Sequence, residues 1–99
     1  MFIAISQFTI ANGMVDEVKA AFINHPHLVD STPGFLDIEI MNSVGNSTEV
    51  CLVTRWEDQQ SHDNWHRGHK YQDSHQGIPK GLKLVPGSTR IQLFDVFAD

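Results

Sequence analysis

The segment from Asn64 to His75, NWHRGHKYQDSH, concentrates side chains that can do chemistry. It holds one indole, three imidazoles, one phenol and two cations. If this segment lies over a sheet, Trp65 and His75 face one cavity. An imidazole beside a bulky aromatic group suits a flat, metal-containing ligand. We therefore expect the functional site here.

Trp65 and His75 also have purely structural interpretations. An indole on a helix commonly packs that helix against a sheet, which would make Trp65 a core residue. An imidazole near a helix end can face solvent or fix a loop, which would make His75 a surface residue. The two side chains alone leave these alternatives open.

Three imidazoles, two of them in this segment, fall on one face of a helix predicted to start at Asp58. His62, His66 and His69 occupy positions i, i+4 and i+7, a spacing that can bring imidazoles to one transition metal. No cysteine completes such a set, and we expect Asp63 to point away from this face. A solvated face rich in histidine is the interpretation we favour.

Other catalytic classes lack the residues they need. Cys51 lies within an apolar stretch, Val50 to Val53, typical of a small buried strand residue and of a reducing compartment. The sequence has no Gly-x-Ser-x-Gly elbow and no glycine-rich turn spaced for a dinucleotide. Nucleophilic serine or cysteine catalysis and dinucleotide binding are therefore not expected.

The charge distribution favours a small anionic ligand over nucleic acid. The formal net charge is −5, yet most of the basic residues lie between positions 64 and 90, where Asp73 is the one acidic residue. An acidic chain with one local group of cations is a poor nucleic-acid binder but can receive an anionic ligand. The basic groups of this region are Arg67, Lys70, Lys80, Lys83 and Arg90.

The length predicts one domain, residues 1–99, that benefits from a partner. A chain of 99 residues buries a smaller share of its surface than a larger domain does, so we expect an oligomer. No apolar run approaches the length of a membrane span, and no basic region precedes an apolar run at the N-terminus. We expect a cytoplasmic protein that binds no membrane.

Hydrophobic periodicity predicts four strands and two helices. Strands alternate apolar and polar residues or are apolar on both sides, whereas helices repeat apolar residues every three or four positions. Asn12-Gly13, Ser31 to Gly34 and Asn42 to Ser47 are turns, and Gly77 to Gly87 is a long loop that we expect to act as a flexible lid. The predicted strands are Phe2 to Ala11, Phe35 to Met41, Thr48 to Trp56 and Thr89 to Phe97; the helices are Met14 to Asn24 and one from Asp58.

This order, β-α-β-β-α-β, predicts an α+β ferredoxin-like sandwich in which two helices cover one face of an antiparallel sheet. Three of the predicted strands carry apolar residues on both sides. The face without helices would therefore expose a large apolar surface in a monomer. We predict a homodimer in which the two sheets pack face to face.

The chain resembles the antibiotic biosynthesis monooxygenase superfamily over nearly its whole length. Within that superfamily it is most similar to the haem-degrading monooxygenases of the staphylococcal iron-regulated surface determinant type. The ten-residue spacing from Trp65 to His75 is the more specific feature, since the other motifs occur in members with different chemistry. The resemblance rests on Met1 to Phe8, Pro33-Gly34-Phe35, Thr54 to Glu57 and Trp65 to His75.

The resemblance implies a role for each matching residue. His75 would be the axial ligand of haem iron, and Trp65 would press on the porphyrin and distort it. Ser6 stands where these enzymes carry an asparagine that hydrogen-bonds toward iron-bound ligands, so the shorter hydroxyl departs from the pattern. Haem propionates need cations or donors at the rim of the pocket, for which Arg67, Lys70, Lys80 and Lys83 are the candidates.

We therefore expect a haem-degrading monooxygenase that opens the porphyrin ring with O2 and electrons from an external reductant, supplied by a reductase, and releases iron. Haem is then both substrate and cofactor. One alternative is a cofactor-independent oxygenase of the same superfamily that acts on an aromatic or quinol substrate, with His75 or Tyr71 as the acid–base group. Another alternative is a haem-binding protein without catalysis, which Ser6 makes plausible.

Overall fold

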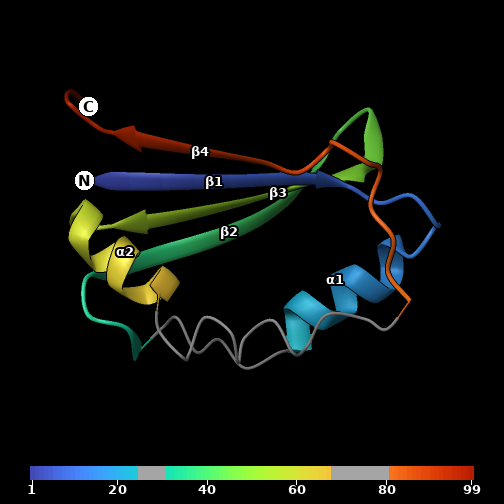
Figure 1. Cartoon of the computed structure of the whole chain (residues 1–99), viewed down its shortest axis with the longest axis horizontal. Coiled ribbons are helices and arrows are strands. Elements are labelled where there is room, and N and C mark those ends of the chain that lie inside the picture. Colours follow the sequence, from blue (N-terminus) through green and yellow to red (C-terminus); the bar gives the residue numbers. More distant parts are fainter. Residues whose placement is uncertain (25–30, 68–80) are drawn as a thin grey trace.

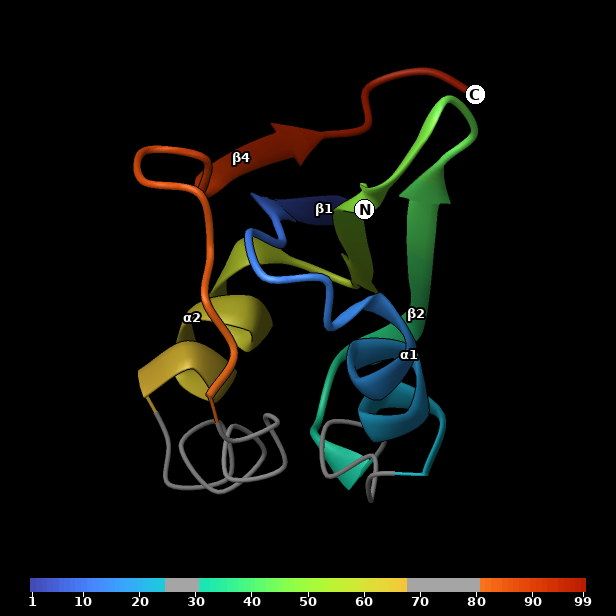
Figure 2. The same cartoon turned by 90° about the vertical axis from the view of Figure 1, so that its right-hand side faces the viewer.

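The computed structural model describes residues 1–24, 31–67 and 81–99, and these form a four-stranded antiparallel sheet with two helices on one side (Figures 1 and 2). All six predicted elements are confirmed, with ends that shift by a few residues. In chain order they are β1 (Phe2–Thr9), α1 (Val15–Asn24), β2 (Phe35–Ser43), β3 (Asn46–Trp56), α2 (Gln59–Arg67) and β4 (Arg90–Asp95).

The strands lie in the order β2-β3-β1-β4, as the ferredoxin-like arrangement requires. Ser6 of β1 pairs with Leu52 on one side and with Ile91 on the other. Residues directly opposite each other in antiparallel strands point to the same face. Since Phe2 and Ala4 are buried and Gln7 is exposed, the even-numbered residues of β1 face the helices. Ser6 therefore shares the helix side with Leu52 and Ile91.

Two groups of buried residues hold the helices on the sheet. The first consists of Phe2, Ala4 and Trp56, and Trp65 of α2 packs against it. The second consists of Ile10, Val18 and Val50, so that α1 covers the opposite end of the same face. The two helices thus lie side by side beneath the sheet, one over each end of β1 (Figure 1).

The segment before β4 is fixed to the end of β1. Ile10 and Leu84 form an isolated antiparallel bridge. The amide of Ala11 donates to the carbonyl of Lys83 at 2.8 Å, and that of Val85 donates to Thr9 at 2.8 Å. These backbone bonds extend the sheet by a short piece. The described part of the predicted lid, from residue 81 onward, is therefore anchored, which contradicts its expected freedom to close.

The face without helices is mixed in character. Ile3, Ile5 and Val53 give it an apolar centre, in which Ile5 pairs with Val53 and Val53 is already buried within the chain. Arg55 lies toward one end and bonds to Asp37 at 2.9 Å and to Glu39 at 2.6 Å. These two bonds, first the one to Asp37, hold the pKa of the Arg55 guanidinium above its ordinary value. The predicted apolar surface is thus present, with a charged border.

Candidate functional site between helix α2 and the sheet

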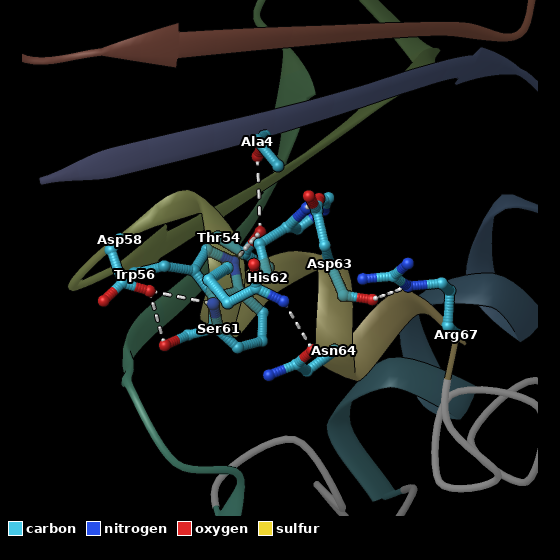
Figure 3. A network of polar contacts seen from close by, with 10 residues as sticks. Ala4, Thr54, Trp56, Asp58, Ser61, His62, Asp63, Asn64 and Arg67 are labelled. Atoms are coloured by element: carbon cyan, nitrogen blue, oxygen red, sulfur yellow. Dashed lines mark hydrogen bonds and ion pairs between the residues drawn. The ribbon is translucent and has the colours of Figure 1, made fainter.

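Helix α2 begins with a cap that its sequence predicts. The Asp58 carboxylate accepts the Ser61 amide at 2.8 Å and the Ser61 hydroxyl at 2.7 Å (Figure 3). Such a cap satisfies an amide that would otherwise lack a partner in the first helical turn. The hydroxyl bond first, and then the amide bond, lower the pKa of Asp58 below its ordinary value.

The turn at Pro33 and Gly34 receives this helix start. Gly34 has φ of +83°, and a Cβ atom there would overlap the Oγ and Cβ atoms of Ser61. The amide of Glu57 donates to the Gly34 carbonyl at 2.8 Å. Two features require glycine at this position: the left-handed backbone and the close approach of α2. The turn therefore fixes where α2 starts on the sheet.

His62 lies at the centre of the contact between α2 and the sheet. Its side chain is 13% exposed, and its ring centroid lies 5.2 Å from that of Phe2 and 5.6 Å from that of Trp56. The His66 ring is 5.9 Å away. His62 is thus largely covered by the sheet, which corrects the expectation of a wholly solvated histidine face; His66 is the exposed member of this pair.

Asp63 contacts the neighbouring imidazole, contrary to the expectation that it points away. Its Oδ1 lies 3.1 Å from Nδ1 of His62. Across residues 1–24, 31–67 and 81–99, no group of three or more metal-binding side chains is present. His69, the third member of the predicted histidine set, lies outside these ranges.

Trp65 and Ser6 come from different elements to the same layer of the molecule. Trp65 is partly buried against the Phe2, Ala4 and Trp56 cluster. Ser6 follows Ala4 on the helix side of β1 and is also partly buried. Trp65 thus packs helix α2 on the sheet, as its structural interpretation predicts. The roles of Trp65 as an aromatic wall and of Ser6 as a hydroxyl donor stay predictions.

The two described candidates for a cationic rim lie apart. Arg67 ends α2, and its Nε donates to the backbone carbonyl of Asp63 at 3.2 Å (Figure 3). Lys83 lies in the segment attached to the C-terminal end of β1. Helix α2 lies at the other end of β1 (Figure 1). Lys70, Lys80 and the proposed iron ligand His75, together with Tyr71, lie outside the described residues. The complete rim and the iron ligand remain predictions.

Two features of the site were not predicted from the sequence. The first is the close contact between Ser61 and Gly34, which are far apart in the chain. The Pro-Gly-Phe motif indicated a turn at Gly34 but not this contact. The helix side of β4 keeps apolar side chains exposed, with Ile91 at 58% and Leu93 at 48%. The alternation of side chains in this strand indicated which residues share a face. It could not show that the helices leave the apolar residues of their own side exposed.

The chain belongs to the antibiotic biosynthesis monooxygenase family, whose model matches residues 1–77. A curated relative from Mycobacterium tuberculosis, named heme oxygenase (mycobilin-producing), is 26% identical over 66 residues. That match covers 67% of this chain and 63% of the relative. The chain thus matches somewhat less than two thirds of the length of this relative.

Solved structures share the fold across the whole chain. The heme degrader MhuD from Mycobacterium tuberculosis, with two hemes bound in its active site, superposes with a TM-score of 0.80 at 22% identity, covering 100% of this chain and 98% of that one. SnoaB, a cofactor-independent oxygenase from Streptomyces nogalater, gives 0.78 at 13% identity, covering 99% and 94%. Both likenesses confirm the ferredoxin-like fold. No helix in the described part of the chain is long and apolar enough to cross a membrane.

Proposed function

We propose that this protein is a haem-degrading monooxygenase that opens the porphyrin ring with O2 and external electrons and releases iron. The observation that carries the proposal is the similarity to the mycobilin-producing heme oxygenase, together with the placement of Trp65. Haem supplies the iron that activates O2 and the porphyrin carbon that is oxidised. The chain supplies the binding surface, the iron ligand and the hydrogen-bond donor.

Trp65 acts as a wall against one face of the porphyrin. Its packing on the Phe2, Ala4 and Trp56 cluster restrains the indole, and a restrained side chain would position a bound ring better than a loose one. Ser6 faces the same side of the sheet and would donate a hydrogen bond to the ligand, directly or through one water. His75 would hold the iron through a neutral imidazole nitrogen.

A second candidate function is favoured by the likeness to SnoaB, a cofactor-independent oxygenase of the same fold. In that case the substrate is an aromatic or quinol compound that activates O2 through its own carbanion. His75 or Tyr71 then takes or donates the proton. Such a protein has no need for stoichiometric haem binding, and this difference separates the two functions.

A haemin titration followed in the Soret region tests the proposal. We expect saturation near one haem per chain and loss of the Soret shift in His75→Ala. Weak, unsaturable binding that ignores this substitution would exclude haem as the substrate and direct the search to phenols and quinols. Ascorbate is then added as reductant under air with catalase present: a degrader bleaches the Soret band while a tetrapyrrole absorption rises, and a haem carrier keeps the band.

We further propose that the protein is a cytoplasmic homodimer joined through the sheet face without helices. Ile3, Ile5 and Val53 form the apolar centre of that face, and Met41 and Phe94 remain substantially exposed on it. Exposed apolar groups on one sheet face commonly mark a contact between proteins. The charged border around Arg55 then lies toward the rim, where water can still reach it.

A further inference from the structure

Strand β4 presents exposed apolar side chains on its helix side, which neither α1 nor α2 covers. Leu93 pairs with Ala4 and Ile91 pairs with Ser6, so these four residues share that side. Ala4 is buried, whereas Leu93 is 48% exposed and Ile91 is 58% exposed. In both views β4 is the element of the sheet farthest from α1 and α2 (Figures 1 and 2). The helices thus protect the β1 side of this surface and leave the β4 side open.

This open surface adjoins Ser6 and the cluster against which Trp65 packs. Ser6 is the direct neighbour of Ile91 across the β1–β4 pair. Ala4, the direct neighbour of Leu93, belongs to the cluster of Phe2, Ala4 and Trp56 that Trp65 contacts. Adjacent strands lie about 5 Å apart, and alternate residues along one strand lie about 7 Å apart. A hydroxyl and the cluster that holds the indole therefore border a small apolar area.

We infer that Ile91 and Leu93 form the floor on which the flat ring of the substrate lies, and that they determine its selection. The inference rests on the proposed function and extends it to two residues of β4. A planar apolar ligand that covers the exposed parts of both side chains would lie with one face toward this side of the sheet, to which Ser6 also points. Flat apolar area selects ring systems, while the hydroxyl of Ser6 offers a polar contact beside it.

A matched pair of substitutions on β4 tests the inference. Leu93 and Phe94 are neighbours with almost equal exposure, 48% and 47%, but they point to opposite faces of the sheet. We expect Leu93→Gln to weaken haemin binding about ten-fold, because the ligand loses apolar contact area. Ile91→Gln should have a similar effect. Phe94→Gln should bind haemin as the unsubstituted protein does. Because Phe94 lies on the face proposed for the dimer, thermal unfolding and light scattering confirm that each variant is folded and keeps its molar mass.

The outcomes separate this inference from the proposed function. If the Leu93 and Ile91 variants bind haemin as tightly as the unsubstituted protein, these residues do not contact the ring. The inference is then rejected, while haem binding by the protein is not. Equal losses in Leu93→Gln and Phe94→Gln assign the effect to β4 as a whole and also overturn it. Weaker binding in the helix-side variants, without turnover in the unsubstituted protein, supports the floor and rejects degradation. Absence of saturable haemin binding by the unsubstituted protein rejects both.

Discussion

Replacing Gly34 by alanine tests whether the Pro-Gly-Phe turn fixes helix α2. The substitution has two costs. A left-handed backbone costs a non-glycine residue about 1–2 kcal/mol. The added methyl group also overlaps Ser61 of α2, and overpacking of this kind typically costs about 1–3 kcal/mol more. We therefore expect Gly34→Ala to lower the free energy of unfolding by about 2–5 kcal/mol.

Gly13→Ala is the matched control. Gly13 has φ of +72°, and its added Cβ would meet nothing within 4 Å. This variant therefore has the backbone cost alone, and both variants share the small gain from a stiffer unfolded chain. Urea unfolding of the two variants and the unsubstituted protein, followed by far-ultraviolet circular dichroism, gives the difference. We expect Gly34→Ala to be less stable than Gly13→Ala by about 1–3 kcal/mol.

A double substitution isolates the contact itself. Ser61→Gly removes the side chain that the new methyl group overlaps, so Gly34→Ala should cost less in that background. The coupling free energy of the cycle should be about 1 kcal/mol or more. Two results together would refute the idea that this turn fixes α2. They are losses of unfolding free energy in Gly34→Ala and Gly13→Ala that agree within about 0.5 kcal/mol, and additivity in the cycle.

Three further predictions concern the core, the helix cap and the dimer. Phe2→Ala should cost about 3–5 kcal/mol in urea unfolding because the ring is buried against His62, whereas Phe97→Ala, 99% exposed, should change stability by less than about 0.5 kcal/mol. Asp58 has a lowered pKa, so its ionised cap stabilises the fold above the ordinary value of 3.8, and this contribution is lost as the pH falls through the folded-state pKa. The destabilisation by Asp58→Ala should therefore be smaller below the folded-state pKa than at neutral pH. An equal loss of stability at the two pH values would contradict the assignment. Ile5→Lys should halve the molar mass measured by light scattering, and an unchanged mass would place any dimer contact elsewhere.

Local sequence signals determined the elements and their order. Apolar alternation identified the strands, and Asp58 identified the start of α2, because capping and periodicity depend on residues only a few positions apart. The β-α-β-β-α-β order then leaves few arrangements of the sheet, so the fold followed with it. The same signals put Trp65 on a helix and Ser6 on a strand. The structure packs Trp65 against the sheet and places Ser6 on the side of the sheet that the helices cover.

Contacts between distant residues were decided only by the tertiary structure. A helical spacing of histidines does not tell which ring the sheet covers, and contact with Phe2 and Trp56 covers most of the His62 ring. The glycines of the loop from Gly77 to Gly87 predicted mobility, yet backbone hydrogen bonds with Thr9 and Ala11 anchor its described part. These outcomes depend on the register and separation of whole elements, which no short stretch of sequence contains.

The exposed side of β4 likewise depends on both local sequence and tertiary packing. The sequence predicted that Ile91 and Leu93 lie on one face of the strand and Phe94 on the other. Which face stays uncovered depends on how far the two helices reach across the sheet, and that reach is set by the seat of α2 on Gly34 and by the packing of α1 on Ile10 and Val50. The sequence by itself therefore determined the fold and the residue types of the site, while tertiary packing decided which surface remains free to receive a ligand.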